Sequence, residues 1–168
     1  NIGYVPRSRR SARAKISFTV DGLTDTSTLT LNSGVVCNGS GDNTNYIFSI
    51  PSNITVPVVN GFAEFSNIEV YEGVYITQNF TVDTSLFNQR YILDNSFIDT
   101  STIKVKVKSS SSATSSVTYT QIDNIVGVTS TSNSYLLQEI EDERYELIFG
   151  DNVIGKKLSN SNVITVSY

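Results

Sequence analysis

Histidine, methionine and tryptophan are absent from this 168-residue chain, and Cys37 is its only cysteine. Without histidine, the chain lacks the commonest general base and the commonest metal ligand, so its own residues cannot build a Ser-His-Asp or Cys-His catalytic group. A single cysteine rules out an internal disulfide, a redox pair of cysteines and a Cys/His zinc site. The sequence therefore predicts no metal, no cofactor and no enzymatic activity.

Charge and long apolar runs are also scarce. Charged residues make up 17% of the chain, the net charge is −4 and the pI is near 4.7, which is not typical of a nucleic-acid-binding protein. No apolar stretch reaches the roughly 18 residues that a membrane span requires, and no signal-peptide pattern opens the chain. We expect neither nucleic acid nor membrane as a partner. Because residue 1 is not Met and residues 163–168 look like a strand, we also expect a segment of a larger protein.

Apolar residues recur with the period of two that is typical of β-strands. Ile16, Phe18 and Val20 alternate with polar residues, and further short runs of this kind follow to the end of the chain. Turn residues separate the runs, with a loop expected at residues 39–43 and a turn at Asn60-Gly61. No helical period is sustained. The pattern predicts an all-β fold, either an antiparallel β-sandwich or a partly open barrel, built as one domain or two small β subdomains.

The same pattern suggests an organisation along the chain. We expect a connector at residues 1–13, a β subdomain at 14–108, a flexible Ser-rich loop at 109–116, and a β-hairpin-rich continuation of the β domain at 117–168. The hairpin is predicted from residues 135–140 and 145–149. Ile103, Val105 and Val107 alternate with three lysines, a pattern that favours an edge strand protected from pairing with other chains.

Several groups of polar or aromatic residues are candidate sites. Pairs among Glu64, Glu69 and Glu72 could serve as acid and base on a sugar, but acidic residues on a solvated strand face are the simpler interpretation. Asp42, Asn43 and Asn45, or the acidic residues at 139–143, could offer oxygen ligands to calcium, but neither group matches a ligand-loop spacing, so an ordinary turn is the simpler interpretation. A Ser-Lys pair has no supporting pattern. The aromatic residues that could stack on sugars, but more often fill a core, are Tyr71, Tyr75, Phe80 and Tyr91.

Three stretches resemble a known family. They are residues 2–6 with Ser11-Ala12; Asn88-Gln89-Arg90-Tyr91 followed by residues 98–102 and Val105; and residues 135–139, 145–151, Gly155-Lys156-Lys157 and 163–168. In this order they resemble the baseplate wedge protein of T-even-type contractile-tailed bacteriophages, which forms the ring between wedges and is related to the baseplate J-like proteins. In the turn formed by Gly150-Asp151-Asn152 and Gly155, Asn152 stands where a glycine often occurs in the family, and Asn tolerates the left-handed conformation.

The resemblance implies a structural subunit segment of a phage tail baseplate, assembled in the host cytoplasm and located in the virion tail. It implies a helical region before residues 1–13, contacts with other wedge proteins and with copies of the same protein, and no catalysis; the fragment alone could be monomeric. From charge asymmetry we expect partner contacts at Arg7, Arg9, Arg10 and Arg13. The alternative is a surface-exposed β module that binds a glycan or a host receptor.

Overall fold

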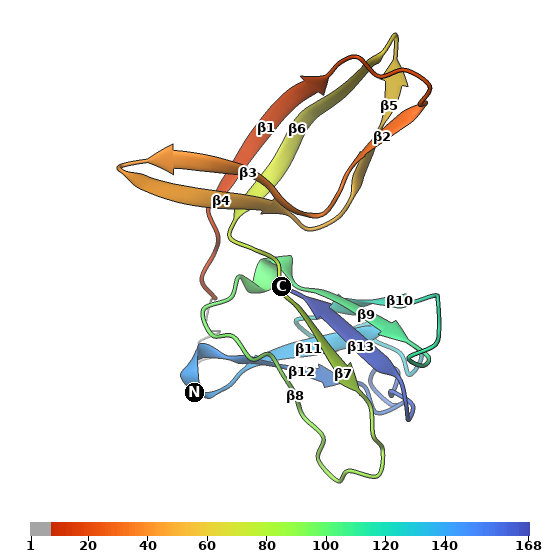
Figure 1. Cartoon of the computed structure of the whole chain (residues 1–168). Coiled ribbons are helices and arrows are strands. Elements are labelled where there is room, and N and C mark those ends of the chain that lie inside the picture. The colour runs from red at the N-terminus through yellow and green to blue at the C-terminus, as the bar shows by residue number, and fades with distance from the viewer. Residues whose placement is uncertain (1–7) are drawn as a thin grey trace. The chain divides into compact units, whose positions relative to one another are not determined.

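The computed structural model describes residues 8–168, which form an almost entirely β fold (Figure 1). The chain divides into two compact units, one containing Ser11–Tyr75 and the other containing Ile76–Tyr168 together with residues 8–10. Each unit has its own sheet and its own hydrophobic core. The predicted all-β class with two small subdomains is confirmed. None of the described residues form a helix long and apolar enough to span a membrane.

The first unit is a six-stranded antiparallel sheet in the order β2-β5-β6-β4-β3, with β1 also pairing with β6. Its strands are β1 (Arg13–Val20), β2 (Thr28–Leu31), β3 (Gly34–Gly41), β4 (Thr44–Ile50), β5 (Ile54–Val59) and β6 (Phe62–Glu72). Ala63 and Phe65, and then Ile68 and Val70, are buried alternate residues of β6, because successive side chains of a strand point to opposite faces. The alternation changes phase between these pairs, where Asn67 has a positive φ of 54°. Phe65 of β6 stacks on Phe18 of β1, with ring centroids 4.8 Å apart, at the centre of this core.

Two tight turns set the register of the first unit. Asn60-Gly61 joins β5 to β6 with positive φ at both residues, as the sequence predicts for a two-residue hairpin turn. Asp42-Asn43 joins β3 to β4 in the same way. The expected loop at residues 39–43 is therefore wrong in extent, because residues 39–41 continue β3 and only Asp42-Asn43 form the turn. Glycine in a strand misled the prediction, since it is more frequent in loops.

The second unit is a seven-stranded sheet in the order β7-β13-β9-β10-β11-β12-β8. Its strands are β7 (Thr77–Thr81), β8 (Tyr91–Ile92), β9 (Lys104–Lys108), β10 (Val117–Gln121), β11 (Ser134–Glu139), β12 (Tyr145–Phe149) and β13 (Val163–Ser167), with short 3-10 turns η1 (Thr100–Thr102) and η2 (Glu141–Glu143). The hairpin of β11 and β12 is confirmed. The sheet is mixed and not purely antiparallel, because β10 pairs with β11 in parallel.

The side chain of Gln78 brings the two ends of this sheet together. Its Nε2 donates to the carbonyl of Ile92 at 3.1 Å, and its Oε1 accepts from the backbone N–H of Asp94 at 3.1 Å. Phe80 of β7 packs edge-to-face on Tyr91 of β8, with centroids 5.6 Å apart. The hydrogen bonds of the Gln78 side chain thus take the place of backbone hydrogen bonds between β7 and β8. The sheet is nearly barrel-shaped as a result, in agreement with the predicted partly open barrel.

Two predictions about the second unit are wrong. The predicted β subdomain at residues 14–108 spans both units, which divide between Tyr75 and Ile76, because β7, β8 and β9 pair with strands formed by residues 117–168. β9 is also not an edge strand, because it pairs with β10 on one side and β13 on the other. Its alternation did indicate the solvated face correctly: Val105 and Val107 are buried, while Lys106 is exposed. Alternating lysines indicate which face of a strand is solvated, but they do not indicate whether the strand lies at the edge of its sheet.

Candidate functional site: the loop between β7 and β8

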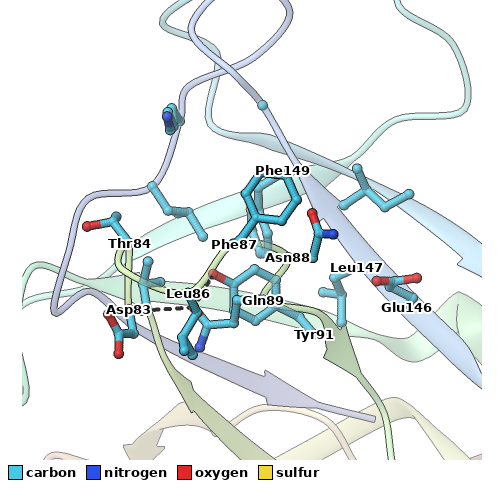
Figure 2. A pocket seen from close by; sticks show the side chains of 15 residues that line it. Asp83, Thr84, Leu86, Phe87, Asn88, Gln89, Tyr91, Glu146, Leu147 and Phe149 are labelled. Atoms are coloured by element: carbon cyan, nitrogen blue, oxygen red, sulfur yellow. Dashed lines mark hydrogen bonds between the residues drawn. The ribbon is translucent and has the colours of Figure 1, made fainter.

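Residues 83–90 connect β7 to β8 through a loop that is held in place at its base by Gln89. The Gln89 amide donates to the carbonyl of Thr81 at 2.7 Å and accepts from the N–H of Asp83 at 2.8 Å. The Tyr91 hydroxyl donates to the same Gln89 oxygen at 3.1 Å. One side chain therefore joins both ends of the loop and ties them to the aromatic core (Figure 2).

Two further sets of contacts fix the flanks of this loop. The Asp83 carboxylate accepts from the hydroxyl and the N–H of Ser85, at 2.6 and 2.9 Å, and these bonds lower the pKa of Asp83. Arg90 forms a two-pronged ion pair with Glu146 of β12, with N–O distances of 2.9 and 2.6 Å, which raises the pKa of Arg90. The loop is thus anchored to β7, to itself and to β12, which is the arrangement expected of a pre-organised contact surface.

The anchored loop presents large apolar side chains to solvent. Phe87 is 93% exposed and Leu86 is 56% exposed. Beside them lies a pocket of about 370 Å³, lined by residues from β8, β12 and the loops at 82–90 and 150–158 (Figure 2). Its apolar part includes Tyr91 and Phe149, whose rings meet edge-to-face with centroids 5.5 Å apart.

A second loop, residues 150–158, borders the same pocket through Gly150, Lys157 and Leu158. Asp151 accepts from the N–H groups of Ile154 and Val153, which lowers its pKa. A methyl group on Gly150 would overlap the backbone of Gly155, so only glycine fits there. This loop too carries an exposed apolar side chain, because Val153 is 73% exposed.

The turn within this second loop has the conformation expected from the sequence. Asn152 has a φ of 73°, in the left-handed region that Asn tolerates. Its side chain also accepts from the N–H of Lys157 at 2.9 Å, and its own N–H donates to the carbonyl of Gly155 at 3.0 Å. Asn152 therefore contributes a hydrogen bond that glycine could not provide.

The arginines predicted to contact a partner lie in different settings. Arg9 is 3.8 Å from a carboxylate oxygen of Glu143 and its guanidinium lies over the ring of Phe97 at 3.9 Å, so it packs against its own unit. Arg13 is 4.0 Å from Glu69 and lies over Tyr71. Arg10 is exposed, and Arg7 lies outside the described residues. The expected contacts of these arginines with a partner stay a prediction.

The other groups considered from the sequence are placed as follows. Glu64, Glu69 and Glu72 are exposed residues of β6, and Glu69 accepts from the Tyr71 hydroxyl at 2.7 Å. Phe80 and Tyr91 are half-buried and pack against the core of the seven-stranded sheet. Tyr71 and Tyr75 belong to the other unit, so the structure does not bring the four aromatics together within one unit. Within residues 8–168, no three acidic or cysteine side chains lie close enough together to hold a metal ion.

Sequence reasoning did not identify Leu86 and Phe87. The available signal was an apolar pair inside a polar segment bounded by turn residues, where an apolar side chain has no core position to fill. Compared with known proteins, the chain matches no family model and no curated protein sequence.

Proposed function

We propose that this chain is a structural segment of a contractile-phage tail baseplate wedge that acts through protein–protein contacts. The observation that carries the proposal is Phe87, an aromatic side chain that is 93% exposed on a loop anchored by Gln89 and Arg90. Aromatic residues are enriched among the residues that dominate binding energy at interfaces. Because these contacts hold the loop before a partner arrives, binding would require little additional loss of conformational entropy.

The resemblance to the wedge family specifies the partner as another baseplate protein. The second loop, which borders the same pocket, supports a contact of useful size because it carries two further exposed apolar side chains, Val153 and Ile154. Clusters of exposed apolar side chains on soluble proteins commonly mark interaction sites. A rigid β scaffold that presents two such loops is suited to a load-bearing assembly.

The test is competition with baseplate assembly by added chain. Baseplate assembly in extracts of phage-infected cells would be followed by electron microscopy, and antibodies against the chain would identify its place in free baseplates and intermediates. We expect an excess of the parent chain to inhibit assembly and Phe87→Ser to lose most of that inhibition. Phe62→Ser, which removes a 53% exposed phenylalanine from the other unit, is the matched control. Equal inhibition by the parent chain and Phe87→Ser would overturn the role of this loop.

One observation favours the alternative of a module that binds a glycan or a host receptor. The pocket beside Phe87 is within the usual volume range of ligand sites, and it combines aromatic rings with polar groups such as Asn88 and Lys157. Glycan screening with the parent chain and Asn88→Ala would separate the two functions. Binding of a defined glycan that Asn88→Ala weakens, with antibody label at fibre tips, would support this alternative over the wedge.

A further inference from the structure

The sheet edges of this molecule differ in how well they are protected from pairing with another chain. In the seven-stranded sheet, β7 and β8 are the end strands, and Gln78 bridges them. Among the described strands of the six-stranded sheet, β1, β2 and β3 each pair with a single neighbour, whereas β4, β5 and β6 each pair with two or more neighbours over at least part of their length. Exposed edges present unpaired backbone N–H and C=O groups, and natural proteins protect them with short strands, charged residues, bulges or proline.

β3 is the least protected of these edges. β2 has only four residues, and β1 carries Arg13 and Lys15. β3 has eight residues with no charged residue and no proline. Its one protective feature is a register shift between Val35 and Cys37, which leaves residues 37–41 as a regular pairing segment.

Hairpin geometry identifies which backbone groups face outward from β3. The Asp42-Asn43 turn places Gly41 opposite Thr44, and in a two-residue hairpin this flanking pair exchanges both hydrogen bonds. Hydrogen-bonded and non-hydrogen-bonded pairs alternate along an antiparallel ladder, so Gly39 bonds to β4 as Gly41 does. The backbone N–H and C=O groups of the residues between them, Asn38 and Ser40, therefore point away from β4. Within the described part of the chain, β3 pairs with β4 alone.

The outer part of the β3–β4 hairpin also lacks support from the rest of its sheet. β4 pairs with β6 only at Phe48 and Ser49, and the Ile47 carbonyl accepts from the N–H of Gly73, so residues 38–47 extend beyond this junction as a two-stranded ribbon (Figure 1). Two-stranded ribbons are marginally stable in water unless further strands are added. Tyr46 and Ile47 of this ribbon are 36% and 43% exposed. Another strand beside β3 would satisfy the outward backbone groups and cover part of this apolar surface.

We propose that this edge binds a second copy of the chain, through antiparallel pairing of β3 with β3 of the other copy. An edge with no charged residues offers no counter-charge to a charged strand of another protein, whereas pairing with itself brings no like charges together. A two-fold pairing of this kind closes after two copies, because each β3 edge is then occupied. The result is a four-stranded sheet shared between two copies, at a surface independent of the Phe87 loop.

Sedimentation velocity of the chain over a wide concentration range tests the proposal. We expect a monomer–dimer equilibrium with a dissociation constant in the micromolar to millimolar range. Ser40→Pro removes one outward N–H from each copy without removing a bond to β4, so it should weaken dimerisation by roughly tenfold or more. Ser40→Thr keeps the N–H and should dimerise like the parent. Circular dichroism would confirm that both variants fold.

A charge-swap pair gives a second, independent measurement. Asn38→Lys and Asn38→Glu should each be more monomeric than the parent, because each brings like charges together across the two-fold axis, while their mixture should form a mixed dimer. Asn38→Gln is the neutral control. A parent chain that stays monomeric at all concentrations overturns the proposal, as does a dimer that Ser40→Pro leaves unchanged. Phe87→Ser should not alter this equilibrium, so the outcome is separable from the test of the Phe87 loop.

Discussion

Replacing Gln78 should open the nearly closed sheet of the second unit. Gln78→Ala removes the bonds to the Ile92 carbonyl and the Asp94 N–H, and it also removes an acceptor 3.1 Å from the Tyr168 hydroxyl. At about 1 kcal/mol for each hydrogen bond, with an added penalty for half-buried groups left unpaired, we expect a loss of about 2–4 kcal/mol in the free energy of unfolding. The Tyr168 hydroxyl keeps its bond to Asn95 at 2.8 Å, which limits the loss.

Urea unfolding measured by circular dichroism, with calorimetry to resolve the two units, gives the magnitude. Native-state hydrogen exchange at the Asp94 N–H gives the location, since this amide should lose protection in Gln78→Ala. Asn79→Ala on the same strand is the control: it loses one exposed side-chain bond, from the Thr165 hydroxyl, and should cost less than about 1 kcal/mol. A loss in Gln78→Ala no greater than in Asn79→Ala would refute the idea that Gln78 closes the sheet.

Gln78→Glu refines the same prediction through its pH dependence. The carboxylate keeps the acceptor for Asp94 but opposes the Ile92 carbonyl, so the ionised form is disfavoured in the folded state and the pKa of this carboxyl is raised. A raised carboxyl pKa means that the folded state binds more protons, so the deficit relative to the parent should shrink as the pH falls through that pKa. A deficit that grows at low pH would contradict the assigned donor and acceptor roles.

Three further perturbations have definite expected outcomes. Burial raises the pKa of Tyr135 to about 12, so its contribution to stability should be complete below pH 10 and should decline by up to roughly 2 kcal/mol as the pH rises toward 12. Tyr135→Phe should flatten that alkaline decline in a series of urea unfolding curves. Gly150→Ala should destabilise by about 3 kcal/mol or more, because the new methyl group meets the Gly155 backbone. Calorimetry checks this, and Gly41→Ala is the comparison, because its φ is not in the left-handed region and its added methyl comes no closer than 4.0 Å to another side chain. Arg90→Leu should lower the melting temperature and loosen residues 83–90 in hydrogen exchange, because the mostly buried Glu146 side chain loses its partner.

The sequence predicted local structure better than the partners of each strand. Alternation in Ile16–Val20 and Val105–Val107 identified buried faces, and Asn60-Gly61 identified a turn, because side-chain period and turn conformation are local properties. Strand neighbours were not predictable in the same way. β9 lies between β10 and β13, and β7 pairs with β13 across some eighty residues of chain.

The candidate site was the least predictable part of the molecule. The exposure of Phe87 depends on Gln89 contacting Thr81 and on Arg90 reaching Glu146, which are tertiary contacts with no sequence pattern of their own. The predicted arginines were selected by charge alone. Two of them, Arg9 and Arg13, are partly occupied by intrachain contacts that charge asymmetry cannot reveal.

The position of β13 has a consequence for how the chain folds during synthesis. All strands of the first unit are complete once Glu72 has been made, so that unit can fold while the rest is still being translated. β7, in contrast, has β13 as its one strand partner among residues 8–168 and must wait for residues 163–167, a delay of roughly 4–16 s at ordinary rates of translation. During that interval the edge of β9 that later receives β13 is also open. We therefore expect nascent chains of the second unit to depend on chaperones and those of the first to be largely independent of them.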